Sequence, residues 1–474
     1  MIPNKKLIYR LTCFLTFLCF ISSCKVAEKP PLPSLSQMPA SFNGNTDTTS
    51  IGNIHWKDFF EDKHLLSLID TALKNNPDLL AAVQRIEVAR ADLAIARGAM
   101  LPSVDARFRS RSGNIYNNLL NGTINGDRNT VTQTENYFLG LQSTWEIDLW
   151  GKLKNRRKAA FARFMASEKG QQLLTTTLVA EVAQLYYDLL GLDNELEAIE
   201  KNIALQENAL EIIKIQKIGG RATELAVQQF HAQLLRTRSL GLEKRQQIIE
   251  VENQLNLVLG RYPQPITRGE SILLQHLPKV ISAGVPSDLL LRRPDIQQAE
   301  LELLAADADV ESARAAFLPS FTITPYAGVH TRSLPAIFNT PESLVLGFLG
   351  GITAPIFMNG QIRADFARSS AINKEAFYNY QKHILTAYQE VASNLQKVEN
   401  YKNVYALREE EAEVLTSAVS TSNDLFMAGY ASYLEVITAQ GSVLEAELSK
   451  ANTRKEIFLA LIDLYRSLGG GWQQ

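Results

Sequence analysis

The stretch that decides the fold is RRPDIQQAELELLAADADVESARAAFLPS, residues 292–320, because a second version of it stands earlier in the chain. Residues 76–103 read NPDLLAAVQRIEVARADLAIARGAMLPS and align without a gap at a constant offset of 217. Farther along, the offset becomes 209, so that Gly220 falls on Gly429. Agreement at so many Gly, Pro and Ala positions indicates two copies of one supersecondary unit.

Each copy predicts a helix followed by a pair of strands. Apolar residues at three- and four-residue spacing predict a helix over residues 65–99, which Pro102 ends. Alternation of apolar with charged or polar residues then predicts strands. The predicted strands are residues 103–112 and 136–149, joined by a polar loop over 113–136, and residues 320–330 and 344–358 in the second copy.

The strands predict one apolar and one polar face. A soluble sandwich is one interpretation, but charges on the polar face and aromatic residues near the strand ends fit lipid outside and water inside. Four strands cannot close a barrel, and an open edge is not tolerated in hydrocarbon. Three chains would supply twelve strands.

Long helical hairpins complete each copy. Residues 152–217 and 361–427 lack Pro and nearly lack Gly, and glycine-containing breaks follow at 219–223 and 429–432. Helices of this length need partners, so each copy is expected to end in an antiparallel coiled coil. The expected fold is therefore mainly α with a membrane β-barrel portion: two tandem repeats that form, as a trimer, a twelve-stranded β-barrel on an α-helical barrel.

The amino terminus reads as a secretory signal. Basic residues precede an apolar run and Ile-Ser-Ser-Cys, which predicts a signal peptide over residues 1–23 and lipidation of Cys24. An ordinary signal peptide or an uncleaved anchor is the alternative. The remaining organisation is a lipid-anchored segment over 24–60, a first repeat over 61–260, a connecting segment over 261–285 and a second repeat over 286–474.

Composition and motifs exclude several function classes. The formal net charge is −2 and no basic block occurs, so nothing indicates nucleic-acid binding. No zinc-ligand spacing, phosphate loop, nucleophile elbow or cysteine pair occurs, and the Glu409-Glu410-Glu411 run is typical of a solvated helix face. The sequence predicts no enzyme, cofactor or metal.

Four motifs resemble those of a known family. They are GVPSDLLLRRPDI at 284–296, ARAAFLPS at 313–320, DLWGK at 148–152 and LGGGW at 468–472. They are similar to the outer-membrane lipoproteins of resistance-nodulation-division (RND) efflux systems, which are TolC-like. The resemblance implies a homotrimer in outer-membrane lipid that passively conducts small molecules received from a periplasmic adaptor protein and an inner-membrane RND-type pump.

The resemblance also implies functional residues. The hairpin tips would meet the adaptor, although their glycines are expected mainly to permit the turns. A periplasmic gate would lie on the second hairpin, where three copies of Glu435 would attract cations. For Leu434, packing in the apolar seam of the coiled coil is an equally good interpretation. Thr438 and Gly441 differ from the residues that the family pattern has at these positions. The tip residues are Gly219, Gly220, Arg221 and Ala222, with Gly429, Tyr430, Ala431 and Ser432, and the gate residues are Leu434, Glu435 and Thr438.

Two other functions compete with a channel. A lipoprotein whose coiled coils serve only as a scaffold would not need amphipathic strand pairs. A lipoprotein hydrolase would need convergent acids or a nucleophile, for which the sequence offers no motif.

Overall fold

The computed structural model describes residues 28–35, 37–42, 49–116, 131–277, 283–338 and 343–472. The predicted signal peptide and Cys24 lie outside these residues. The chain forms two compact units. Of the described residues, the first unit contains those within 28–34, 87–165 and 301–378, and the second contains those within 35–86, 166–300 and 379–472. Among the described residues, no helix combines the length and the apolarity needed to cross a membrane.

The elements follow one another in two similar series. The first is η1 (Ile51–Asn53), α2 (Trp56–Phe59), α3 (Lys63–Asn75), α4 (Pro77–Gly98), β1 (Ser103–Tyr116), β2 (Val131–Ile147), α5 (Lys152–Ile218) and α6 (Glu224–Val258). The second is α7 (Asp288–Arg292), α8 (Pro294–Ala315), β3 (Ser320–Thr331), η3 (Leu334–Phe338), β4 (Leu344–Thr353), α9 (Gln361–Ala428) and α10 (Tyr433–Ser467).

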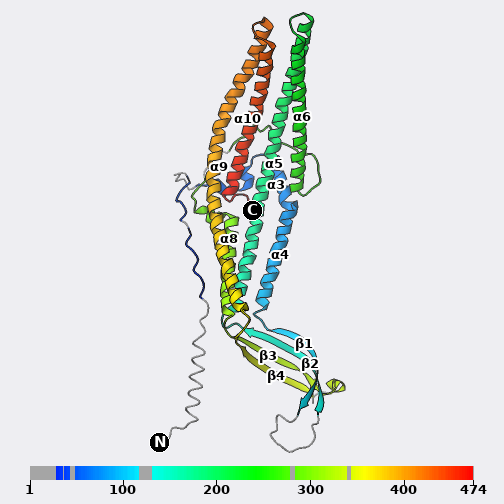
Figure 1. Ribbon diagram of the computed structural model, residues 1–474, viewed down its shortest axis with the longest axis vertical. Coiled ribbons are helices and arrows are strands. Elements are labelled where there is room, and N and C mark those ends of the chain that lie inside the picture. The colour runs from blue at the N-terminus through cyan, green and yellow to red at the C-terminus, as the bar shows by residue number, and fades with distance from the viewer. Residues whose placement is uncertain are drawn as a thin grey trace, which may run out of the picture. The chain divides into compact units, whose positions relative to one another are not determined.

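The first unit holds one antiparallel sheet in which the strands stand in chain order, β1-β2-β3-β4 (Figure 1). The register opposes Phe108 to Leu139, Leu139 to Val329 and Val329 to Leu344, so apolar residues of all four strands share one face. Asp105 lies opposite Gln142 on the other face. The sheet is therefore amphipathic across its whole width.

The strands differ from the predicted ones at their ends. The polar residues predicted as loop continue the β1–β2 ladder as far as the pairing of Tyr116 with Val131. Backbone hydrogen bonds make this ladder, so alternating hydrophobicity is not required for it. Strand β4 ends at Thr353, five residues before its predicted end. Pro355 follows shortly, and a proline cannot donate to a ladder.

The helix predicted over residues 65–99 is two helices. Helix α3 ends at Asn75 and α4 begins at Pro77. Asn76 between them has an extended backbone, and its Oδ1 accepts a hydrogen bond from the Leu79 nitrogen at 2.9 Å. A residue before proline avoids the helical region, and asparagine is a favoured amino-terminal cap, so the Asn-Pro pair separates the helices.

The second unit has its largest apolar cluster where α3 packs with parts of α5, α6 and α10. Leu65, Ile69 and Leu189 are fully buried there, and the rings of Tyr187 and Phe458 stack with centroids 4.5 Å apart. Asp62, the cap of α3, accepts a hydrogen bond from the Tyr186 hydroxyl at 2.6 Å. This cluster joins α5 and α6 of the first hairpin to α10 of the second.

Candidate functional site

The turn of the first hairpin joins α5 to α6 through residues 219–223. The Gly220 nitrogen donates to the Lys217 carbonyl at 3.0 Å, and the Arg221 nitrogen donates to the Gln216 carbonyl at 2.8 Å. These two bonds make a Schellman motif, which requires a left-handed residue. Gly220 supplies it with φ +72°, and nothing lies within 4 Å of the position a Cβ would take. Backbone conformation, and not crowding within the chain, therefore explains Gly220.

The turn of the second hairpin has the same geometry 209 residues later. Gly429 has φ +80°, and the Tyr430 nitrogen donates to the Leu425 carbonyl at 2.8 Å. The Tyr430 side chain is 85% exposed, and Arg221 at the equivalent position of the first turn is exposed too. Both turns therefore present a large side chain to solvent directly after the left-handed glycine.

The two turns differ at the start of the helix that follows. Thr223 caps α6 by accepting a hydrogen bond from the Ala226 nitrogen at 3.2 Å. At the position equivalent to Ala226, α10 has Glu435, whose carboxylate accepts a hydrogen bond from the Ser432 nitrogen. That bond is one arm of a capping box, and a negative charge in the first turn also favours the helix dipole. The carboxylate of Glu435 thus has a structural task in its own chain.

The other predicted gate residues lie on the exposed side of α10. Leu434 is 57% exposed, and its repeat partner Leu225 is 55% exposed, so neither packs in a seam within its chain. The Thr438 hydroxyl donates to the Leu434 carbonyl at 2.8 Å, as a threonine often does within a helix. Leu434, Glu435 and Thr438 are all exposed within one turn of helix.

An apolar cluster ties the second hairpin to the first near the turns. Val436 of α10 is 1% exposed and packs in a cluster with Phe230 of α6 and Ile213 of α5. The Gln216 amide also lies 3.4 Å from the Met427 sulfur. Displacing the tip of α10 from α5 and α6 must therefore expose Val436 to water, which costs roughly 1.5–3 kcal/mol for a fully buried side chain of this size.

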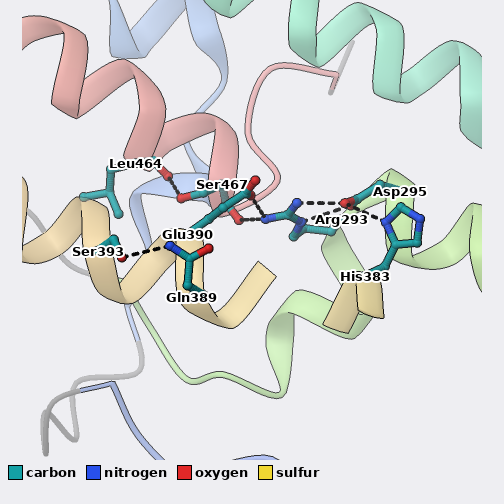
Figure 2. Close-up of polar contacts among 8 residues, drawn as sticks. All are labelled: Arg293, Asp295, His383, Gln389, Glu390, Ser393, Leu464 and Ser467. Carbon is teal, nitrogen blue, oxygen red and sulfur yellow. Dashed lines mark hydrogen bonds and ion pairs between the residues drawn. The ribbon is translucent and has the colours of Figure 1, made fainter. Parts of the chain in front are cut away.

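A buried ion network lies at the other end of the second hairpin (Figure 2). Arg293, in the motif that precedes α8, donates to Asp295 at 2.7 and 3.0 Å and to Glu390 of α9 at 2.7 Å. It also donates to the Ser467 carbonyl at the end of α10 at 3.1 Å. His383 Nδ1 lies 3.6 Å from the Asp295 carboxylate. Three helices are thus joined by one guanidinium.

Electrostatics in this network favour the charged forms. Burial by itself lowers the pKa of Arg293, but its hydrogen bonds and attraction to Asp295 and Glu390 outweigh burial and raise the pKa. Burial likewise raises the pKa of Asp295, but the hydrogen bond and charge of Arg293 hold that pKa below its usual range. The pair is therefore charged across the physiological pH range.

The first repeat makes the corresponding connection without charge. Asn76 aligns with Arg293, and Val258 aligns with Ser467. The Asn76 amide donates to the Val258 carbonyl at 2.8 Å, and Asn76 is 7% exposed. The sequence motif that contains Arg293 indicates the family, but it does not predict that Arg293 bonds to α9 and to the end of α10. The sequence signal for this role is the alignment of Asn76 with Arg293, which places a polar residue directly before the proline of both repeats.

The register places Asp105, Arg107, Arg109 and Glu146 on the polar face of the sheet, whereas Asp148 lies just beyond β2. Asp105, Arg107 and Arg109 alternate along β1, and Glu146 on β2 is 2.5 Å from Lys152. Asp148 follows β2 and accepts a hydrogen bond from the Lys154 nitrogen at 2.7 Å, at the start of α5. Glu146 and Asp148 are thus engaged near the strand end, whereas Arg107 and Arg109 lie farther along the sheet.

Comparison with known proteins gives one consistent result. The model of the outer membrane efflux protein family matches residues 68–261 and 285–470. The cation efflux system protein CusC of Escherichia coli O6:H1 is 28% identical over 96% of this chain and 97% of its own. The probable outer membrane lipoprotein SilC of Salmonella typhimurium is 29% identical over 98% and 99%. The solved outer-membrane channel OprN is 25% identical, with a TM-score of 0.84 over 95% of this chain and all of its own.

Proposed function

The chain belongs to the outer membrane efflux protein family, and we propose that three copies of it close their sheets into one twelve-stranded barrel. As a member of this family it is the outer-membrane channel of an efflux system. The family consists of efflux channels and not of enzymes, so the function to be explained is conduction. The trimer, the gate and the contacts with partners are the parts that we propose.

The sheet carries this proposal, because it combines two open edges with one exposed apolar face. Within the described residues, β1 pairs only with β2 and β4 pairs only with β3. Unpaired backbone groups at such edges cost several kcal/mol each in hydrocarbon. Pairing β4 of one copy with β1 of the next removes all edges once the ring closes, and three copies give twelve strands.

The same sheet supports a placement in lipid. On its apolar face Leu346 is 74% exposed and Phe348 is 68% exposed, and Val104 and Phe108 at the other edge are exposed too. A soluble chain rarely exposes so broad an apolar surface, whereas a membrane barrel requires it on the outside. The polar face with Arg107 then lines the water-filled interior.

We place the partners at the hairpin turns. A periplasmic adaptor protein would contact Arg221 and Tyr430, which are the large exposed side chains after Gly220 and Gly429. Gly219, Ala222, Ala431 and Ser432 complete the two tips. An inner-membrane RND-type pump supplies the energy, and this protein conducts passively. Adaptor binding opens the channel only if the adaptor has a higher affinity for the open state.

We assign the gate to the exposed turn of α10 that holds Leu434, Glu435 and Thr438. In a trimer with α10 toward the axis, three Leu434 side chains narrow the passage and three Glu435 carboxylates attract cations. The hydrogen bond from Ser432 orients the carboxylate and leaves its charge in place. Opening moves the second hairpin outward and must separate Val436 from its apolar cluster.

We also propose that Cys24, after removal of residues 1–23, carries the lipid anchor. A cysteine preceded by two small residues at the end of an apolar run is typical of lipoprotein processing. Mass spectrometry of wild type and of Cys24→Ser tests this. An acyl mass present in both, or in neither, contradicts the assignment.

Single-channel conductance in planar bilayers tests the channel. The detergent-purified protein is measured beside Glu435→Gln and the control Glu445→Gln, which removes another exposed carboxylate of α10. We expect defined cation-preferring steps whose preference weakens in Glu435→Gln alone. Equal effects of both substitutions would remove Glu435 from the gate. A stable monomer that makes no pore would refute the channel assembly and favour a scaffold.

A further inference from the structure

The polar face of the sheet carries two aromatic side chains that the channel function leaves unexplained. The rings of Phe138 on β2 and Tyr326 on β3 meet edge to face, with centroids 6.1 Å apart and planes at 78°. Both are half-buried. Polar faces of barrel strands normally carry hydrophilic side chains, so a pair of aromatic rings there requires a reason.

The rings lie over glycines. Gly140 and Gly328 oppose each other in the register, and a Cβ on either would come within 2.9 or 3.0 Å of the Phe138 ring. A Cβ on Gly347 would in the same way meet the ring of Tyr326. A ring that covers the backbone of a glycine has one side against the sheet and turns its other side away from it.

Two arginines of β1 occupy positions opposite Phe138 and Gly140 on the same face. Arg109 is the cross-strand partner of Phe138, and Arg107 is the partner of Gly140. Arg107 lies 3.8 Å from Asp105, but Arg109 forms no ion pair among the side chains that the structure describes, which exclude those of residues 111–135. Directly opposed residues lie within reach of each other on one face, so a ligand that contacts the Phe138 ring can also reach the Arg109 guanidinium.

We propose that Arg109, Phe138 and Tyr326 form a binding site for small planar aromatic carboxylates. This inference rests on the proposed function, in which the polar face lines the barrel interior. A guanidinium binds a carboxylate in a bidentate manner, and an aromatic ring adds stacking that an aliphatic anion cannot use. The sides of the rings that face away from the glycines are the stacking surfaces for the ligand, and the arginines disfavour organic cations.

The test compares benzoate with cyclohexanecarboxylate, which has the same charge and similar size but no aromatic face. Ligand-observed NMR titration of the full-length, detergent-purified protein at low salt gives the affinity for each. Sedimentation of every sample reports whether it is a trimer. The variants are Phe138→Leu, Arg109→Gln and the control Phe348→Leu, which removes an aromatic ring from the apolar face. Tyr326→Leu replaces Phe138→Leu if the latter does not fold.

We expect wild type to bind benzoate about three- to tenfold more tightly than cyclohexanecarboxylate. Phe138→Leu should abolish this preference, Arg109→Gln should weaken binding of both probes, and Phe348→Leu should change neither. A trimer that binds both probes equally, or in which Phe138→Leu and Arg109→Gln match wild type, overturns the site and leaves the channel standing. A wild-type protein that does not trimerise overturns the proposed function and this site with it.

Discussion

Replacing Arg293 by methionine should destabilise the second repeat more than any comparable change in the first. The guanidinium is 9% exposed and bonds two carboxylates and the Ser467 carbonyl. Methionine keeps much of the volume and removes the charge, which leaves Asp295 and Glu390 without their main partner. Removing one partner of a buried ion pair costs about 3–5 kcal/mol.

The measurement is equilibrium urea unfolding of the detergent-purified protein, monitored by far-ultraviolet circular dichroism. Asn76→Ala is the matched control, because Asn76 fastens the corresponding helix end in the first repeat with one neutral bond to Val258 and a cap. Its loss should cost about 1–2 kcal/mol. Adding Glu390→Gln to Arg293→Met should recover part of the lost stability, because it removes one unpaired charge.

The contribution of the Arg293–Asp295 pair to stability should depend on pH in a definite direction. The pKa of Asp295 is lowered in the folded protein, so its contribution is present above the unfolded pKa of about 3.9 and is lost as pH falls through the folded value. Without Arg293, burial raises this pKa instead. As pH falls, the stability gap between wild type and Arg293→Met should therefore begin to narrow at the raised pKa of Asp295 in the variant, above about pH 4, and should narrow further below pH 4 as wild type loses the contribution of Asp295. The reasoning would be refuted if Arg293→Met lowered the free energy of unfolding no more than Asn76→Ala does, and if its difference from wild type did not change with pH. Arg293 would then not stabilise the repeat through its charge.

Three further outcomes are expected. Gly220→Ala should cost about 1–2 kcal/mol because its φ is positive, whereas Gly219→Ala should cost much less; equal urea midpoints would contradict the backbone explanation. Phe230→Ala should lower the free energy of unfolding by about 3–5 kcal/mol because it opens a cavity, whereas Leu225→Ala at an exposed position should lower it by under about 0.5 kcal/mol. Equal losses in the two variants would show that the cluster is loosely packed. Burial raises the pKa of Tyr186 in the folded protein, so its contribution to stability is complete below about pH 10 and is lost as pH rises further. The free energy of unfolding should therefore fall less steeply with alkaline pH in Tyr186→Phe than in wild type. Equal slopes would show that Tyr186 does not cause the alkaline loss of stability.

The sequence was a good guide where the determining interaction is local. Each hairpin turn follows from a glycine after a long run without proline, and the structure has a left-handed residue at Gly220 and at Gly429. The apolar and polar faces of the strands follow from period-two alternation. The break at Asn76 was also encoded by the following proline, but helical periodicity on both sides concealed it.

The candidate gate shows where sequence patterns stop being informative. Leu434 has the spacing of a seam residue, and only the packing of α10 reveals that it is exposed while Val436 is buried. The sequence predicts Glu435 as a gate charge, and only the folded turn shows that its carboxylate also accepts a hydrogen bond from the Ser432 nitrogen. Burial and hydrogen bonding at these positions depend on the neighbouring hairpin and the turn geometry, which no local pattern contains.

The sequence by itself determined the repeat, the order of helices and strands, and the two-faced sheet, because periodicity, proline and glycine act over a few residues. The tertiary structure alone decided that Arg293, directly before α8, bonds to α9 and to the end of α10. It also decided that Phe138 and Tyr326 meet over glycines of neighbouring strands. Residues more than 90 positions apart make these contacts, and their energies depend on burial and register, which only the folded chain fixes.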